Sequence, residues 1–532
     1  MIRLAINLAI ILCASQLWAA KCGFDVLMQH QREVKQGTAR MLAKQGTCTA
    51  DDLIDPSAVR VDTTAHFRII YTLKGPHAVI GSDTLTRARP PYIDTLMQAL
   101  EHAYKLHTDT IGMRVPRGPT QSYHYQISAY PEKFAVEVID IDLLRNISSV
   151  LGSICAGCYG LTLPDANDQS LTSLFVDNDF RYQTSTDPLT TVATADGKTC
   201  TYTQSNRKLI GEANGQPIDY TVDWNKAIHV TATHELYHTC QLRYANYNDN
   251  YHFWFEASAV GVEDLGAPTV NDYFQYLPQI FSHPEISMLD FTQGGGMRPY
   301  GQGVFYHYQV HRFGKRFDPG TWELLEKHPL RSIDSIFNDH FIAQGIAGGF
   351  PEVFADHALH LAYANSRSKL IPADSIWDAD LASWPAMSLS DFSLDSAPTA
   401  PFSFRLYPSN MKLTYWSLPS GYRKTDFTLG DSVFTLLSVG FVADSSTGSV
   451  VPKIAQAYPI PWRGSGSLFF HLTITGPIEI FDMGRNKIAE VPYTGNPIRS
   501  WDGSVKGKLI APGVYYWHGK SEKQLHRFLV IR

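Results

Sequence analysis

The stretch ATHELYHTCQ, residues 232–241, places two histidines four positions apart and a glutamate directly after the first. It lies in a longer helical pattern, WNKAIHVTATHELYHTCQLRYA, over residues 224–245. Positions i and i+4 share one face of a helix, so His234 and His238 can direct their imidazoles at one metal ion. Glu235 is rotated by about 100° from His234, which suits a general base beside the ion. The alternative is an ordinary amphipathic helix.

A third ligand is needed, because a catalytic zinc takes three protein ligands and leaves a fourth position open. A metzincin-type continuation would require Gly at 241 and His at 244, and this chain has Gln241 and Tyr244. Glu256 follows in the segment FWFEASAVGVED, whose apolar residues predict a buried helix. An unpaired carboxylate would be costly there, and a metal ion would supply its partner.

An HExxH helix followed by a Trp-x-Glu-small-x-Ala stretch resembles the gluzincin metallopeptidases, whose third zinc ligand is that glutamate. Trp254, Glu256 and Ala259 match this pattern, and Glu263 recurs seven residues further on. The resemblance implies zinc-dependent hydrolysis of peptide bonds, with Glu235 as the general base. The zinc ligands that it assigns are His234, His238 and Glu256.

A second match concerns the hydroxyl that steadies the oxyanion. In aminopeptidase-like gluzincins a Tyr-x-x-Gly at the start of a helix supplies it, and Tyr300 followed by Gly303 fits that position. Rival donors are His252, His307 and His311. The chain lacks the Gly-x-Met-Glu-Asn strand of aminopeptidases, so an N-terminal exopeptidase is not supported. Residues of about 60–390 as a whole resemble secreted bacterial gluzincin-like metalloproteases.

Length and composition bound the protein class. The 532 residues are too many for one core and predict two or three domains. Apolar residues make up 44% and charged residues 18%, as in globular proteins. The formal net charge of -6 provides no basic face, so we expect no nucleic-acid partner.

The first residues have the layout of a secretory signal peptide. Arg3 precedes an apolar run from Leu4 to Leu17, and small residues follow, with cleavage expected near Ala19 or Ala20. No later segment is apolar enough to span a membrane. We therefore expect a secreted or cell-surface protein, exported from a Gram-negative bacterium.

The cysteine count of the mature chain is even, which in an exported protein predicts disulfides. The six residues are Cys22, Cys48, Cys155, Cys158, Cys200 and Cys240. Proximity favours Cys22 with Cys48 and Cys155 with Cys158, which leaves Cys200 with Cys240, although sequence alone does not fix the pairing. A redox or zinc pair is the alternative for the CAGC segment at 155–158.

The pattern along the chain predicts an α+β fold with a mixed sheet and a helical subdomain. Strands are expected over 66–73, 123–130 and 173–179, and a helix over 92–107. Further helical patterns cover 224–245, 251–265, 301–314 and 349–366. From about Pro398 short alternating segments separated by turn residues predict β-sandwich modules.

The C-terminal segment resembles type IX secretion sorting domains and related FlgD-like Ig modules, which implies a contact with the secretion machinery. The matching residues are Pro459, Pro461, Asp482, Gly484, Arg485, Trp501, Asp502, Gly503, Pro512, Gly513 and Tyr515. We divide the chain into a signal peptide (1–20), an N-terminal extension (21–60), a gluzincin-like metallopeptidase domain (61–395), a β-rich module (396–454) and an Ig-like C-terminal domain (455–532).

Two functions from different classes remain at this point. The first is a zinc metallopeptidase acting on protein or peptide substrates. The second is an exported adhesion or binding protein on the same scaffold, with the metal structural or absent. Glu235 separates them, because it coordinates nothing and serves only to activate water. A serine or cysteine hydrolase is disfavoured, since no G-x-S-x-G segment occurs.

Overall fold

The computed structural model divides into two compact units. Unit 1 covers the described parts of 1–280, 289–336 and 377–384, and unit 2 those of 281–288, 337–376 and 385–532. The described residues are 48–82, 89–147, 157–165, 167–184, 186–213, 215–247, 251–290, 297–373, 376–390, 400–408, 422–440, 455–458, 468–472, 477–492, 498–520 and 526–530. The predicted signal peptide lies outside them.

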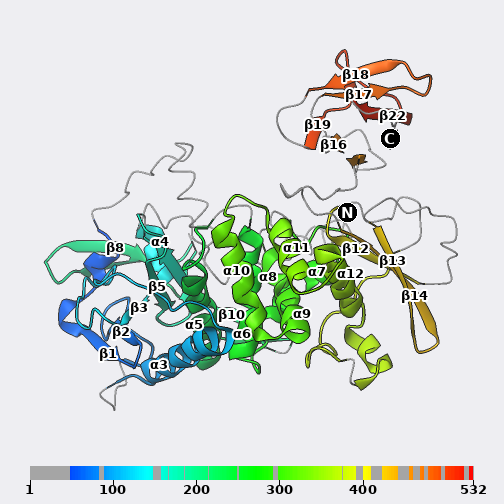
Figure 1. Ribbon diagram of the computed structural model, residues 1–532. Coiled ribbons are helices and arrows are strands. Elements are labelled where there is room, and N and C mark those ends of the chain that lie inside the picture. Colours follow the sequence, from blue (N-terminus) through cyan, green and yellow to red (C-terminus); the bar gives the residue numbers. More distant parts are fainter. Residues whose placement is uncertain are drawn as a thin grey trace, which may run out of the picture. The chain divides into compact units, whose positions relative to one another are not determined.

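Unit 1 contains a five-stranded mixed sheet with the strand order β1-β2-β3-β5-β4 (Figure 1). The central strands β2, β3 and β5 are parallel, and β1 and β4 pair antiparallel at the two edges. The strands are β1 (Val59–Thr63), β2 (Phe67–Thr72), β3 (Phe134–Ile139), β4 (Gly160–Pro164) and β5 (Thr172–Asp177). The mixed α/β class is thereby confirmed, whereas the zincin-like assignment stays a prediction.

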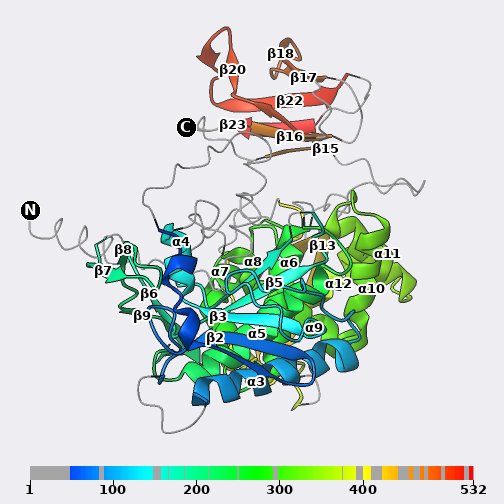
Figure 2. The same ribbon diagram turned by 90° about the vertical axis from the view of Figure 1, so that its left-hand side faces the viewer.

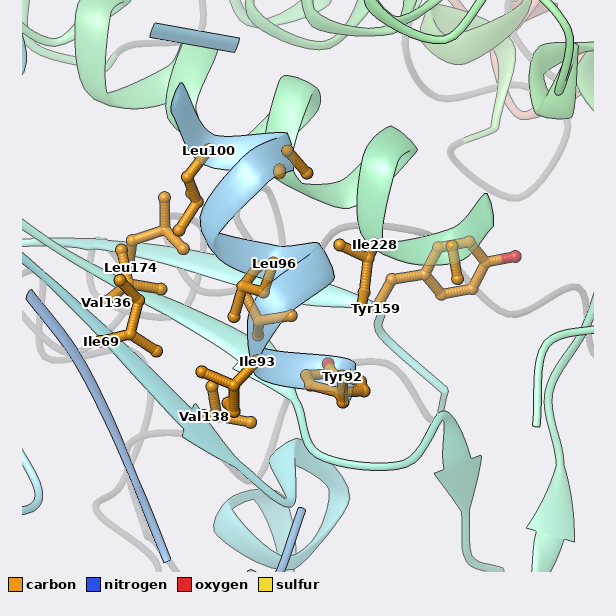
Figure 3. Packing of buried hydrophobic residues seen from close by; sticks show 14 of the residues in the cluster. Ile69, Tyr92, Ile93, Leu96, Leu100, Val136, Val138, Tyr159, Leu174 and Ile228 are labelled. Atoms are coloured by element: carbon orange, nitrogen blue, oxygen red, sulfur yellow. The ribbon is translucent and has the colours of Figure 1, made fainter. Parts of the chain in front are cut away.

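Both faces of this sheet are buried. Successive residues of a strand point to opposite faces, so Ile69 joins the cluster beneath helix α3 (Pro91–Tyr104) and Ile70 joins the cluster on the other side. Figure 3 shows the side chains of α3 directed at the central strands. The residues that meet there are Ile93, Leu96 and Leu100 from α3 and Ile69, Val136 and Leu174 from the strands. This packing fixes the sheet against which the site helix lies.

The strand predicted over 123–130 is wrong. The backbone amides of Tyr123, His124 and Tyr125 donate hydrogen bonds to the carboxylate of Glu137, at 2.5, 2.8 and 3.2 Å. Burial raises the pKa of Glu137, and these amides offset part of that cost. Alternating residues predicted a strand, but the segment pairs with a buried carboxylate instead of a neighbouring strand.

Buried carboxyl groups stand at the ends of β3 and β5. Burial and the charge of Asp179 raise the pKa of Asp140 to about 8, and burial raises that of Asp179 to about 6. The Asp140 carboxylate accepts hydrogen bonds from the amide of Leu143 and the hydroxyl of Ser205, at 2.8 and 2.9 Å. The folded chain therefore holds protons at a pH where the unfolded chain has released them.

Stability should accordingly fall as the pH rises. A carboxyl group whose pKa is higher in the folded state contributes stability fully below the unfolded value of 3.8 and loses it as the pH passes the folded value of about 8. Replacing Asp140 by Asn should flatten this slope, by up to about 1.4 kcal/mol per pH unit for one proton. Urea unfolding at several pH values measures it, with exposed Asp109→Asn as control. An unchanged slope would contradict the assignment.

Unit 1 also contains helices, and those predicted over 92–107, 224–245, 251–265 and 301–314 lie near their predicted positions. The site helices are α5 (Trp224–Gln241), α6 (His252–Gly266), α8 (Arg298–Gly301) and α9 (Gly303–Phe313). The others are α4 (Ile141–Ile147), α7 (Pro278–Phe281) and α10 (Asp318–Lys327), and α3 continues into the π-helical segment Lys105–Ile111. Helix α11 (Ile333–Ala343) begins in unit 1, and its residues from 337 onward belong to unit 2. Helix α5 packs against α3, β4 and β5 (Figure 2), so tertiary contacts stabilise a sequence rich in Thr and His.

Unit 1 also contains short two-stranded sheets, and a disulfide bond is attached to one of them. The pairs are β6 (Arg181–Tyr182) with β9 (Arg207–Lys208), β7 (Leu189–Ala193) with β8 (Thr199–Thr203), and β10 (Ile210–Ala213) with β11 (Gln216–Asp219). Cys200 on β8 is bonded to Cys48, with a Cα–Cα distance of 5.7 Å. An ion pair between Lys198 and Asp52 lies beside this bond, at 3.0 Å.

Two predicted cysteine pairings are therefore wrong, namely Cys22 with Cys48 and Cys200 with Cys240. Cys240 is a free thiol, fully buried on α5, and Cys200 is bonded to Cys48 instead. Cys158 is disulfide-bonded, as predicted for the CAGC segment. Its predicted partner Cys155 lies outside the described residues, as does Cys22. The presence of disulfides is confirmed, and long-range folding, not proximity in sequence, selects the 48–200 pair.

Unit 2 contains helix α12 (Gly349–Ala362) and a three-stranded antiparallel sheet in the order β12-β14-β13. These strands are β12 (Ser403–Pro408), β13 (Tyr422–Leu429) and β14 (Ser432–Val439), and α12 packs on β14. Residues 337–376, which we assigned from sequence to the metallopeptidase domain, thus belong to the same unit as this sheet. Residues 411–418, one of the short alternating segments expected after Pro398 to form strands, lie outside the described residues.

The C-terminal part of unit 2 is all β. One sheet has the order β15-β16-β19 and another β18-β17-β22-β23, and their apolar residues share one cluster that includes Phe470 and Trp517. The strands are β15 (Ala455–Tyr458), β16 (Leu468–Leu472), β17 (Ile478–Phe481), β18 (Lys487–Val491), β19 (Ile498–Trp501), β22 (Gly513–Gly519) and β23 (His526–Val530), with a small hairpin of β20 (Ser504–Val505) and β21 (Lys508–Leu509). The Ig-like assignment stays a prediction. Across the described residues, no helix has both the length and the apolar character needed to cross a bilayer.

Candidate metal centre

Helices α5 and α6 pack against each other and bring three potential ligands to one point. His234 and His238 lie one turn apart on α5, and Glu256 lies on α6. One ligand atom from each of the three lies within 4.8 Å of the others. The structure thus brings together the three side chains that the sequence singled out as metal ligands.

The geometry of this cluster is compact. The Nε2 atoms of His234 and His238 are 3.0 Å apart, and the carboxylate oxygens of Glu256 lie 3.3 and 3.6 Å from them. Each of the three side chains is at most 1% exposed. Within the part of the chain that the structure describes, neither oxygen of Glu256 makes a hydrogen bond, and the fully buried carboxylate faces the two imidazoles. Two imidazoles and one carboxylate are the ligand set of a catalytic zinc site, and the residues therefore fit that ion.

A second carboxylate supports the cluster from behind. His234 Nδ1 lies 2.6 Å from Glu263 Oε1, a residue on the next turns of α6. Burial lowers the pKa of His234, but the neighbouring carboxylates of Glu256 and Glu263 outweigh it and raise the value to about 10. A cation at Nε2 must displace this proton, so metal binding and proton release are linked.

Glu235 lies outside the ligand group and points to the edge of the sheet. Its Oε2 accepts a hydrogen bond of 2.8 Å from the hydroxyl of Thr162 on β4, and it is 1% exposed. Thr162 also contacts the backbone oxygen of Glu235 at 2.9 Å. The side chain predicted to be the base is therefore fixed by one strand residue and coordinates nothing.

Gly160 on β4 makes room for Glu235. A Cβ at this glycine would lie 2.6 Å from Glu235 Cγ and 2.6 Å from Thr231 Cγ2, closer than real contacts allow. Nothing in the residues around Gly160 predicted this close approach. Only glycine lets β4 run this near to the helix that carries the candidate base.

The Gly160→Ala variant should consequently displace Glu235. We expect a loss of stability of about 1–3 kcal/mol from overpacking and a fall in turnover of about 100-fold, since a shift of about 1 Å in a reacting group has that effect. Gly211→Ala is the matched control, because its Cβ would meet Tyr220 at 2.1 Å, away from Glu235. Peptide hydrolysis by both folded variants, with unfolding curves, gives the comparison. Equal turnover in both would contradict a role for Glu235.

Tyr300 lies near the cluster, and its ring faces that of His234. It is on α8, 2% exposed, and its ring is nearly parallel to that of His234, with centroids 6.4 Å apart. Of the rival donors, His307 pairs with Asp378 at 3.1 Å, and His311 stacks edge-on with Trp377. His252 Nδ1 is hydrogen-bonded to the hydroxyl of Tyr247.

Sequence reasoning missed three partners of the cluster, namely Thr162, Gln241 and Glu263. Glu263 was noted only as a recurring acid, and Gln241 only as a departure from the metzincin pattern. A carboxylate seven residues after Glu256, two helical turns on, was the available signal, since it returns to the same face. Nothing in the local sequence pointed to Thr162.

These observations define a mixed α/β protein with a buried His-His-Glu cluster between two helices. No protein family matches the chain, and no curated relative matches it. A solved structure with some similarity is PorZ, an essential surface component of the type IX secretion system of Porphyromonas gingivalis, at 19% identity and a TM-score of 0.14. The match covers 27% of this chain and 18% of PorZ. A likeness this slight supports no conclusion about fold or function.

Proposed function

We propose that the chain is a secreted zinc-dependent metallopeptidase of gluzincin-like type that hydrolyses peptide bonds. The observation that carries the proposal is the convergence of His234, His238 and Glu256, with the Glu256 carboxylate buried and making no hydrogen bond to any described residue. A buried carboxylate without a donor is costly, and a divalent cation offsets that cost.

Zinc held by these three residues would act as a Lewis acid on the peptide carbonyl and make water more acidic. The remaining work falls to the protein. Glu235 takes a proton from the attacking water and later delivers it to the leaving amine. Thr162 holds Glu235 in place, at 2.8 Å. The hydroxyl of Tyr300 donates a hydrogen bond to the carbonyl oxygen on which negative charge develops.

The packing of helix α5 on the sheet supports this proposal. Helix α5 packs against β4 and β5, so the candidate base lies on a rigid element beside the antiparallel edge of the sheet. This placement agrees with a zincin-like α+β catalytic domain. It also leaves the helical subdomain to supply Glu256 and Tyr300 from separate helices.

Export and attachment form the second part of the proposal. The predicted signal peptide directs the chain out of the cytoplasm, and disulfides such as Cys48 with Cys200 are typical of an oxidising compartment. The two C-terminal sheets with their common cluster agree with an Ig-like sandwich over 455–532. We propose that this sandwich contacts the secretion machinery.

An exported adhesion or binding protein remains the second candidate. The β-rich C-terminal part favours it, since such modules serve binding as often as catalysis. The buried Glu235 speaks against it, because a purely structural metal needs no base beside it.

Metal analysis of the purified full chain tests the proposal, with His234→Ala as control. We expect about one zinc per parent chain and none in the variant, and casein digestion that stops on addition of a chelator and returns with zinc. Stoichiometric zinc without any digestion would favour the binding protein. Absence of zinc from the parent chain, even after incubation with the metal, would rule out the metallopeptidase.

A further inference from the structure

We propose that Gln241, on the last turn of α5, orients the imidazole of His238 for metal binding and ties it to α6, the helix that carries Glu256. The inference rests on the proposed metal site and assigns to Gln241 the role of a positioning residue. It follows from three hydrogen bonds made by one buried carboxamide.

The first bond joins Gln241 to the candidate ligand. The amide oxygen Oε1 lies 2.7 Å from His238 Nδ1. An amide oxygen only accepts hydrogen bonds, so this contact places a proton of the imidazole on Nδ1. Nε2 is the atom that faces His234 and Glu256. The ring is thus held with Nε2, the atom that a metal would bind, directed into the cluster.

The other two bonds fix which way the amide group points. Its nitrogen Nε2 donates to the backbone oxygen of Phe255 at 3.0 Å and to the hydroxyl of Ser258 at 2.9 Å. Ser258 in turn donates its own proton to the backbone oxygen of Trp254, at 2.5 Å. A carbonyl oxygen cannot donate, so a reversed amide would oppose oxygen to oxygen. The α6 backbone therefore decides the tautomer of His238.

The same contacts link the two helices next to the ligands. Phe255 directly precedes Glu256, and Ser258 follows it by two residues. Gln241, Ser258 and His238 are completely buried, so water does not replace any lost bond. One side chain thus holds a ligand of α5 in register with the ligand of α6.

The neutrality of Gln241 suits its surroundings. His234 is oriented by a carboxylate, Glu263, so the cluster already contains two buried carboxylates with Glu256. A third acid at 241 would add a buried negative charge and could not donate to Phe255 or Ser258. A carboxamide accepts from the ring and donates to the helix at the same time.

The zinc dissociation constant of the full chain, measured by competition with a chromophoric chelator, tests the inference. Gln241→Met keeps the volume but removes all three bonds, and we expect zinc binding to weaken by about 10–100-fold. Gln241→Glu retains an oxygen acceptor for His238 and should recover part of that loss. The matched control is Gln309→Met, a buried glutamine on α9 outside the cluster, which should bind zinc like the parent.

A metal-free readout separates this inference from the proposed function. Histidine ¹⁵N NMR at alkaline pH, with the His238 signal assigned from its loss in His238→Asn, should show the Nδ1–H tautomer in the parent and a mixture in Gln241→Met. Parent-like zinc affinity, or an unchanged tautomer, in the folded Gln241→Met variant would overturn the role of Gln241. If the parent binds no zinc, the metallopeptidase fails, and the NMR comparison still decides the role of Gln241.

Discussion

The Glu235→Gln variant will bind zinc like the parent chain and lose peptide hydrolysis by about 10²–10⁴-fold, the contribution typical of general acid–base catalysis. The reason is that Glu235 lies outside the ligand group and contacts Thr162 instead. Glutamine keeps the shape and accepts the same hydrogen bond from Thr162, but it cannot take a proton from water.

The measurement is steady-state hydrolysis of a casein or peptide-library substrate by zinc-loaded protein, with metal content determined on the same sample. Glu323→Gln, an exposed residue of α10, is the matched control and should retain parental activity. Turnover by Glu235→Gln equal to that of the parent would remove Glu235 from the mechanism. Loss of zinc from this variant would place Glu235 among the ligands.

The Glu256→Gln variant should lose high-affinity zinc binding, by more than the roughly 10–100-fold typical of changes to residues that only orient a ligand. Glu256 supplies the negative charge of the ligand set, and its carboxylate faces both imidazoles at 3.3 and 3.6 Å. The amide of glutamine has a neutral oxygen, which is a weaker ligand than a carboxylate. Its NH₂ group can only donate hydrogen bonds and cannot coordinate a cation.

Thermal unfolding with and without zinc measures this effect independently of activity. A ligand at about 1,000 times its dissociation constant stabilises the folded state by about 4 kcal/mol, which corresponds to a shift on the order of 10 °C. We expect that shift for the parent and none for Glu256→Gln. Parental zinc stabilisation of the variant would exclude Glu256 as a ligand and with it the gluzincin-like ligand set.

The local sequence pattern was sufficient to predict features that depend only on neighbouring residues. The four-residue spacing of His234 and His238 determines that both rings share one face of α5, whatever the rest of the chain does. The strands β2 and β5 and helix α6 likewise form where the sequence predicted them. Glu256 was predicted from a family resemblance, and its meeting with the two histidines depends on the packing of α5 on α6.

Contacts between residues far apart in the sequence could not be predicted from local pattern. The bond between Cys48 and Cys200 joins residues 152 positions apart, and proximity in sequence favoured other partners. The segment 123–130 alternates like a strand, but the amides of Tyr123, His124 and Tyr125 pair with Glu137, a buried carboxylate that needs donors.

The sequence by itself determined the elements of the site: two imidazoles on one helix face, an acid beside them, and a second apolar helix with a carboxylate. Only the tertiary structure decided which buried groups complete it, namely Thr162 for Glu235, Glu263 for His234 and Gln241 for His238. The physical reason is that helical periodicity is a property of neighbouring residues. A hydrogen-bond partner for a buried polar atom is whichever distant residue the packing brings within about 3 Å.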